Sequence, residues 1–187
     1  MGQELEAKMQ VPDHEPLRSR LRAAGGERLG ACMELNTFFD SADRALVAQD
    51  KGLRVRHTCD FATGAERHVM TYKGPQQDGA LKNREEVEFV VDDGEQAALL
   101  LERLGYAPTL SFEKRRESWK LDDCLIELDE LPQLGRFVEI EGPDEEAVLA
   151  VRETLELDDR PLVKQSYIAM VDALLKSTGT TKLEFPP

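Results

Sequence analysis

The sequence contains few of the residues that mark several large classes of protein. Its three cysteines show no Cys-x-x-Cys spacing, and its three histidines show none of the spacings typical of zinc sites. We therefore expect reduced thiols, as in a cytoplasmic protein, and no disulfide framework. No stretch has the length and apolarity of a membrane span or a secretion signal, and there is no glycine-rich Walker A loop.

Basic residues are also in deficit, with 24 Lys and Arg against 37 Asp and Glu and a formal net charge of −13. This balance disfavours nucleic acids and anionic membranes, so we expect neither as a partner. It leaves open the binding of a small anion through local basic groups or bound cations. The length of 187 residues and the hydrophobic fraction of 41% fit one globular domain with a sizeable core.

Apolar and polar residues alternate in about eight short segments, which predicts strands, and helical periodicity predicts four or five helices. Most connections between strands are too short for helical crossovers, so we expect a largely antiparallel sheet in an α+β fold. The expected strands are residues 3–10, 34–39, 53–58, 67–73, 83–91, 111–121, 125–129 and 136–141. The expected helices are residues 14–24, 42–49, 95–104, 143–155 and 164–176.

Charged residues recur on one face of strand after strand. In residues 3–10, one face carries Glu4, Glu6 and Lys8, and the other carries Leu5 and Ala7. Acidic pairs one pleat apart occur four times, as Glu4/Glu6, Glu86/Glu88, Glu127/Asp129 and Glu139/Glu141. Basic residues lie on the corresponding faces of the strands, namely Lys8, Arg54, Arg56, Lys73, Arg84, Lys114 and Arg116.

Two architectures can accommodate this pattern. An open sheet packed on helices would leave the charged faces in water, but such a surface has no need for repeated pairs of like charge, which repel. A closed antiparallel barrel would turn the charged faces into a polar lumen and the apolar faces outward, beneath the helices. In a lumen the charges must be paired or neutralised by ligands. Carboxylates suit Mg²⁺ or Mn²⁺, and arginine and lysine suit phosphate, so the lumen of such a barrel is compatible with both ligands.

The ExExK alternation at residues 4–8 resembles the signature of the CYTH superfamily, the triphosphate tunnel metalloenzymes. Further matching segments follow in order over about residues 3–170, at residues 38–40, 52–56, 72–75, 84–88, 112–115, 127–129 and 134–141. The resemblance implies an eight-stranded antiparallel barrel that forms a tunnel, with helices packed outside. It implies a CYTH domain over residues 1–176, which leaves residues 177–187 as a flexible tail. Homodimers occur in this family, so a homodimer is compatible with the resemblance.

The resemblance also implies a role for each matched residue. Metal binding is implied for Glu4, Glu6, Glu86, Glu88, Glu139 and Glu141. A grip on the triphosphate is implied for Lys8, Arg54, Arg56, Lys73, Arg84, Lys114 and Arg116, and Arg115 is an alternative to Arg116. The implied catalytic residues are Lys8, Glu127 and Asp129, of which the two acids would associate with metal or position water. Tyr167 is either a catalytic residue or an aromatic residue packed on the barrel.

The implied activity is that of a metal-dependent triphosphatase, with Mg²⁺ or Mn²⁺ as cofactor and tripolyphosphate, ATP or thiamine triphosphate as substrate. A class IV adenylate cyclase remains open, because both chemistries use the same triphosphate grip and differ in which phosphorus is attacked. A non-catalytic polyphosphate- or nucleotide-binding module also remains open, although it has no need for intact acidic pairs. A plain structural barrel explains none of those pairs.

Overall fold

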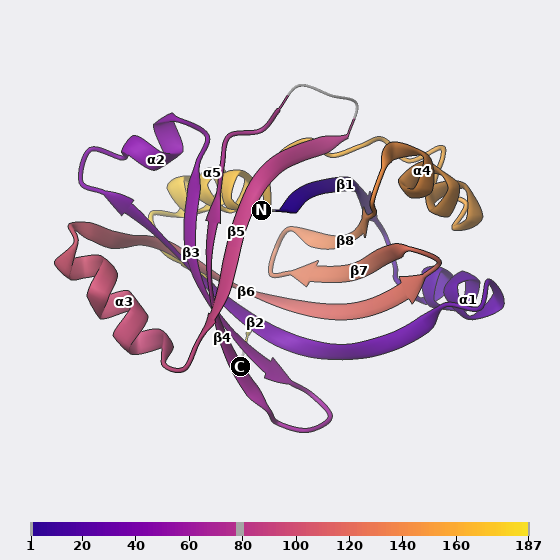
Figure 1. Cartoon of the computed structure of the whole chain (residues 1–187), viewed down its shortest axis with the longest axis horizontal. Coiled ribbons are helices and arrows are strands. Elements are labelled where there is room, and N and C mark those ends of the chain that lie inside the picture. Colours follow the sequence, from indigo (N-terminus) through magenta and orange to yellow (C-terminus); the bar gives the residue numbers. More distant parts are fainter. Residues whose placement is uncertain (1, 78–80, 187) are drawn as a thin grey trace.

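The computed structural model describes residues 2–77 and 81–186, with side chains from Leu5 onward. Its strands are β1 (Gly2–Val11), β2 (Glu27–Ser41), β3 (Gly52–Asp60), β4 (Glu66–Lys73), β5 (Lys82–Val91), β6 (Tyr106–Leu121), β7 (Cys124–Leu131), β8 (Gly135–Glu141) and β9 (Lys182–Leu183). The first eight pair in the order β2-β3-β4-β5-β1-β8-β7-β6, and β6 pairs back to β2 (Figure 1). This closed antiparallel barrel confirms the predicted fold.

Five helices accompany the barrel in the described part of the chain, namely α1 (Glu15–Ala23), α2 (Ala45–Ala48), α3 (Gly94–Arg103), α4 (Glu145–Thr154) and α5 (Tyr167–Thr178). α1 and α4 lie together at one end of the barrel, and α2 and α3 lie at the other (Figure 1). Asp93, Asp144 and Ser166 define the starts of α3, α4 and α5, because each side chain accepts a backbone N–H of the first turn. None of these described helices has the length and apolar character needed to cross a membrane.

Two long strands, β2 and β6, close the barrel. They span 15 and 16 residues, which is longer than the strands predicted at residues 34–39 and 111–121. Their register shifts between Arg28 and Gly30 and again between Phe38 and Phe39. Such irregularities bend a strand and increase its twist, which helps two long strands to curve around a barrel. Gly30 and Pro108 lie beside the two shifts and interrupt the strand pattern in the sequence, so both predicted strands began too late.

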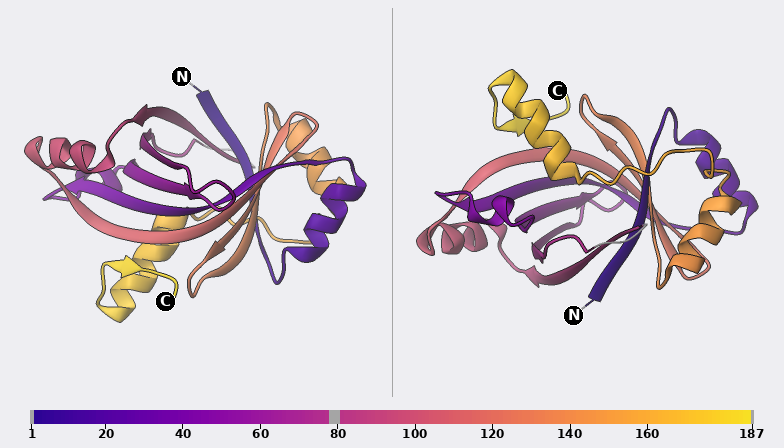
Figure 2. Two further views of the ribbon diagram at one scale, coloured as in Figure 1. Left: turned by 90° about the horizontal axis from the view of Figure 1, so that it is seen from below. Right: turned by 90° about the horizontal axis from the view of Figure 1, so that it is seen from above.

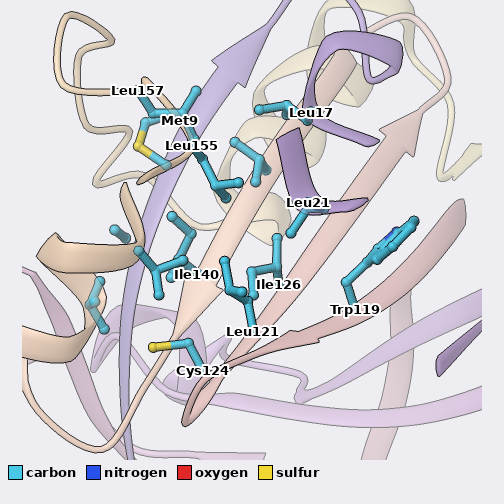
Figure 3. Close-up of a cluster of buried hydrophobic side chains, with 14 of the residues drawn as sticks. Met9, Leu17, Leu21, Trp119, Leu121, Cys124, Ile126, Ile140, Leu155 and Leu157 are labelled. Atoms are coloured by element: carbon cyan, nitrogen blue, oxygen red, sulfur yellow. The ribbon is translucent and has the colours of Figure 1, made fainter. Parts of the chain in front are cut away.

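The outward faces of β1, β6, β7 and β8 form a core with α1 and α4, as the alternation predicts. Met9 and Ile140 from the barrel are completely buried with Leu21 of α1 and Leu155 beyond α4 (Figure 3). Trp119 of β6 packs into the same cluster. Burial of one such side chain contributes about 1.5–3 kcal/mol to folding. This core therefore fixes the strands that carry much of the charged lumen.

α5 packs against residues that point inward. Phe112 and Phe137 share strand faces with lumen charges, and they cluster with Val171 and Leu175 of the helix. Figure 2 shows α5 lying across one side of the barrel, apart from α1 and α4. The parallel pairing of β9 with β6 buries Leu183 in the same cluster. Part of the segment predicted as a flexible tail is therefore packed, because Leu183 completes this cluster.

Candidate functional site

The register of the strands places carboxylates opposite one another in the lumen. Between β1 and β8, Glu6 is paired with Glu141, and Lys8 is paired with Glu139. Between β7 and β8, Glu127 is paired with Glu139. Like charges directly opposite each other destabilise a sheet. Cations are therefore required near these carboxylates to offset their repulsion. In this structure, basic side chains supply the positive charge.

Arg116 lies at the centre of the acidic group. Its Nε and Nη2 donate to the two oxygens of Asp129 at 2.7 and 2.6 Å, and Nη2 also donates to Glu139 at 2.8 Å. Glu127 Oε2 lies 3.6 Å from Arg116 Nε. Burial disfavours the charge of Arg116, but Asp129 and Glu127 outweigh burial and hold its pKa well above the usual value. This predicted triphosphate ligand is thus engaged by carboxylates.

Glu34 of β2 belongs to the site, although the sequence analysis did not include it. Its Oε2 lies 3.1 Å from Lys114 Nζ, and its Oε1 lies 3.2 Å from Arg56 Nη1. Burial alone would raise the pKa of Glu34, but Arg56 and Lys114 outweigh burial and hold it well below the usual range. Asn36, one pleat further on, accepts a hydrogen bond from Arg56 Nε at 3.0 Å. In the sequence, the polar residues Glu34 and Asn36 alternate with the apolar Leu35, and this alternation could have indicated that both face the lumen.

Lys8 is buried deep in the lumen, with 2% of its surface exposed. Its Nζ lies 3.7 Å from Glu139 Oε1 and 4.0 Å from the ring centroid of Tyr167. Burial lowers the pKa of Lys8 from 10.5 to about 7, with Glu139 opposing this shift and Lys82 adding to it. The side chain therefore changes its charge near neutral pH, where an incoming anion can restore the charge.

The strands β3, β4 and β5 line another part of the lumen. Arg54 Nη2 donates to the hydroxyl of Thr71 at 2.9 Å, and that hydroxyl donates to Glu88 at 3.0 Å. Burial and the neighbouring Arg56 lower the pKa of Arg54 to about 10, so it stays charged at neutral pH. Its Nε is buried without a hydrogen-bond partner among the described residues. A buried cation with an unused donor is suited to an anionic ligand.

Lys82, at the start of β5, is a basic residue of the site that was not predicted from the sequence. Its Nζ donates to Glu6 Oε1 at 2.7 Å, so one predicted metal ligand is held by a lysine. Residue 82 lies just before the predicted strand at residues 83–91, which is why its face was not considered. Of Glu4 only the backbone is described, opposite Arg84 in the β1–β5 register. The side chain of Glu4 lies outside the described part.

Two further predicted basic residues, Lys73 and Arg84, also pair with opposite charges. Lys73 Nζ lies 3.1 Å from Glu86 Oε2, across neighbouring strands. Arg84 Nη2 lies 3.6 Å from Asp50 Oδ2, and Asp50 comes from the segment after α2 and is largely exposed. The structure thus pairs most of the predicted residues with opposite charges, in one connected group around Arg116 and in separate pairs such as Lys73 with Glu86, while the partner of Arg84 is an exposed residue.

Tyr167, the first residue of α5, places its ring beside Lys8 and Lys114 in the lumen. Its ring packs edge-on against Phe137 with 5.3 Å between centroids, and Lys114 Nζ lies 5.4 Å from its ring centroid. Burial, with Asp129 second, holds the pKa of Tyr167 well above its usual value, so the hydroxyl stays protonated. That hydroxyl is buried and has no hydrogen-bond partner among the described residues. Tyr167 can therefore pack against Phe137 and also donate a hydrogen bond to a ligand.

The chemistry of the donors fits a hard divalent cation. Glu6, Glu141, Glu139 and Glu127 lie across three neighbouring strands, and all offer carboxylate oxygens, which Mg²⁺ and Mn²⁺ prefer. Within the described part of the chain, no three lumen carboxylates offer ligand atoms that all lie within 4.8 Å of one another. Glu6 forms an ion pair with Lys82, and Glu139 forms one with Arg116. The binding of a cation therefore requires these ion pairs to rearrange.

The order of strands, the charged lumen and the family comparison agree. The CYTH domain family matches residues 2–167 of the chain. The protein belongs to the CYTH family. Enzymes of this family act on triphosphates and depend on metal ions.

Two curated relatives are named for adenylate cyclase activity. The protein MJ0240 of Methanocaldococcus jannaschii, provisionally named an adenylate cyclase, is 24% identical over 176 residues, covering 89% of this chain and 97% of the relative. Adenylate cyclase CyaB of Aeromonas hydrophila is 29% identical over 148 residues, covering 78% of this chain and 72% of the relative. This CYTH protein is thus similar over most of its length to proteins named as cyclases.

Solved structures confirm the fold. PH1819 from Pyrococcus horikoshii matches with a TM-score of 0.79 and 27% identity, covering 91% of this chain and 99% of that one. HpAC1 from Hippeastrum, described as an adenylyl cyclase candidate with a dominant triphosphatase activity, matches with a TM-score of 0.70 and 18% identity over 95% of this chain and 96% of that one. The CYTH barrel is thus shared with these structures.

Proposed function

We propose that this CYTH protein is a metal-dependent triphosphatase that hydrolyses an inorganic or organic triphosphate in its lumen. The observation that supports this proposal best is the set of buried cationic side chains that face one lumen. Arg54 has an unused donor, and Lys8 has a pKa that burial lowers to about 7. Both features favour the uptake of a polyanion, because it would satisfy the donor and restore the charge.

We assign the divalent cation to Glu6, Glu139 and Glu141, with Glu4 from the same strand as a further ligand, and Glu86 and Glu88 to a second acidic pair. Bound by these carboxylates, Mg²⁺ or Mn²⁺ would neutralise charge on the phosphates and polarise the attacked phosphorus. Rearrangement of the Glu6–Lys82 and Glu139–Arg116 pairs would free those carboxylates and both basic side chains.

The basic side chains would hold the triphosphate in line for attack. Arg54, Lys73 and Lys114 come from different strands and would contact different phosphates, and Arg56, Arg84 and Lys8 complete the grip. Their contribution is positioning and electrostatic stabilisation of a transition state whose charge is spread over oxygens. We also assign Tyr167 a donor role, since its buried hydroxyl stays protonated.

Glu127 is our candidate for the base that accepts the proton of the attacking water. Burial raises its pKa, although Arg116 opposes the shift, and Ser118 holds one of its oxygens at 2.7 Å. Asp129 is less suited to this step, because Arg116 and Lys114 occupy its two oxygens. We therefore assign Asp129 the role of positioning these two cations.

An adenylate cyclase is the second candidate, because both curated relatives carry that name. The same residues would hold the triphosphate of ATP, while the ribose 3′-hydroxyl would attack the α-phosphorus and diphosphate would leave. The two activities differ in the position of the attacked phosphorus relative to Glu127. Orthophosphate and cyclic AMP are therefore the products that separate them.

The test incubates the purified protein with tripolyphosphate, ATP or thiamine triphosphate, each with Mg²⁺ or Mn²⁺. Orthophosphate, diphosphate and cyclic AMP are measured together. We expect metal-dependent release of orthophosphate, at least a hundredfold slower in Glu139→Gln and unchanged in the control Glu130→Gln. Glu130 is a suitable control because it pairs with Arg115 and Arg136 outside the lumen network. Cyclic AMP without orthophosphate would establish the cyclase instead, and no product from any substrate would favour a binding module.

Two further expectations belong to this proposal. The three cysteines form no disulfide, which is consistent with the expected cytoplasmic location. A homodimer is expected from the family, and size-exclusion chromatography with light scattering would measure it.

A further inference from the structure

A second group of ligand-type side chains lies on the hairpin of β3 and β4, which projects near the start of α3 (Figure 1). His57 and His68 lie directly opposite each other, and Glu66 lies one pleat from His68 on the same face. One nitrogen of each ring and one oxygen of Glu66 lie within 4.8 Å of one another, and no other such group was found in the described part of the chain. The spacing of histidines in the sequence does not reveal this group, because the register of a hairpin assembles it.

This group faces away from the lumen. On β3, His57 shares its face with Val55, which packs in the outer cluster beneath α3, whereas Arg56 on the opposite face bonds to the lumen residue Asn36. The start of α3 lies close above the group, since a Cβ on Gly94 would be 2.6 Å from His68 Nδ1. An ion held here would therefore be separate from any ion held by the lumen carboxylates.

The two imidazoles have unmet polar groups. His57 Nε2 and His68 Nδ1 are buried without hydrogen-bond partners among the described residues. The rings stack with 4.7 Å between centroids. The carboxylate of Glu66 approaches His57 Nε2 to 3.7 Å, which is too long for a hydrogen bond. A cation that accepts electron pairs from neutral imidazoles would satisfy this arrangement.

We propose that His57, His68 and Glu66 bind one transition-metal ion of the zinc class. Two imidazoles, one carboxylate and a water are a typical donor set for four-coordinate Zn²⁺, whereas Mg²⁺ prefers oxygen ligands alone. Donors around tetrahedral zinc lie about 3.3 Å apart for bonds of about 2.0–2.1 Å. The distance of 3.7 Å between His57 Nε2 and Glu66 Oε2 is close to that value.

Binding requires a small local adjustment. A metal ion lies in the plane of each imidazole that binds it, and the two rings are only 18° from parallel. At least one ring must therefore turn about its side-chain torsions. The side chains of His57 and Glu66 are 34% and 62% exposed, which leaves them room to move. The bound ion would link β3 to β4 beside α3. Arg54 and Arg56 lie on the opposite face of β3.

Co²⁺ is the probe for this site, because its visible spectrum reports four-coordinate nitrogen and oxygen ligands. The untagged protein is freed of metal with a chelator, dialysed and titrated with Co²⁺ in a large excess of Mg²⁺. We expect one Co²⁺ per chain with an intense four-coordinate spectrum that Zn²⁺ abolishes. Glu66→Gln and His57→Gln should each weaken binding at least tenfold, while the control Glu102→Gln on the exposed face of α3 should bind as the wild type does.

A lumen variant separates this site from the proposed active site. Glu139→Gln should keep the Co²⁺ spectrum even when triphosphate hydrolysis is lost. Absence of a four-coordinate spectrum in the wild type, or equal affinity in the wild type and His57→Gln, would overturn the proposal. So would a spectrum lost in Glu139→Gln and kept in His57→Gln, because the ion would then lie in the lumen. Glu66→Gln keeps the test valid if His57→Gln misfolds, since the Glu66 side chain is largely exposed.

Discussion

Replacement of Lys8 by methionine should stabilise the ligand-free protein while weakening its binding of triphosphate. Burial lowers the pKa of Lys8 from 10.5 to about 7. At about 1.4 kcal/mol for each tenfold change in proton affinity, the charged form is disfavoured in the folded state by about 5 kcal/mol, and nearly all of this cost remains at pH 7. Methionine has a similar length and carries no charge, so it removes the cost.

Lost contacts offset part of this gain. Lys8 lies over the ring of Tyr167, and the loss of this contact should cost about 1–2 kcal/mol. The attraction of Glu139 is already included in the lowered pKa. The net gain at pH 7 is then about 3 kcal/mol. For a chain of this length, such a gain raises the melting temperature by about 6–12 °C. The variant would exchange function for stability, a common outcome at binding sites.

The pH dependence distinguishes this explanation from better packing. Between pH 7 and 10.5 the unfolded chain binds a proton at Lys8 that the folded chain does not, so the wild type gains stability as the pH rises. Urea unfolding in chelator should therefore show the full difference at pH 7 and its near loss at pH 10. The exposed Lys120→Met serves as the control and should show no such difference. A Lys8→Met variant that is less stable at pH 7, or equally shifted at both pH values, would refute the reasoning.

Three shorter predictions concern binding and packing. At pH 8 the uptake of triphosphate should bring about 0.9 proton to Lys8, because its pKa in the free protein is about 7; calorimetry in buffers of different ionisation enthalpy measures this, and equal heats would contradict it. Glu34→Gln should lower the free energy of unfolding by about 3–5 kcal/mol, since it removes the carboxylate that pairs with Arg56 and one of the two that pair with the buried Lys114; a loss below about 1 kcal/mol in urea unfolding would argue against the network. Gly94→Ala should cost about 1–3 kcal/mol despite a better helix propensity, because its Cβ would lie 2.6 Å from His68 Nδ1; an unchanged melting temperature would disprove the close approach.

The sequence predicted the faces of the strands better than their ends. Alternation placed Glu6 and Lys8 on the inner face and Ala7 in the outer core, because the period of two in a strand is a local property. Lys82 was missed because it lies one residue before the expected strand. Glu34 was missed because Phe38 shares its face, so that face looked mixed rather than charged.

Pairing between charges could not be predicted in the same way. Arg116 meets Asp129 because β6 and β7 pair in one particular register, and the sequence carries many other acids within reach of such a base. The position of α5 was also hidden, because Phe112 and Phe137 look like exceptions on charged faces until a helix covers them. Likewise His57 and His68 became neighbours only through the hairpin. Each of these features depends on contacts distant in sequence.

The place of β1 in the barrel has a consequence for the order in which the chain is synthesised. The first strand pairs on one side with β5 and on the other with β8, so its partners leave the ribosome long after it does. The edge of β1 that faces β5 lacks its partner until residue 86 has emerged, and the edge that faces β8, where Lys8 pairs, lacks its partner until residue 141 has emerged. Such non-local pairing slows folding and exposes nascent chains to aggregation. The N-terminal strand, which contributes Glu6 and Lys8 to the site, can take its final place only when most of the protein already exists.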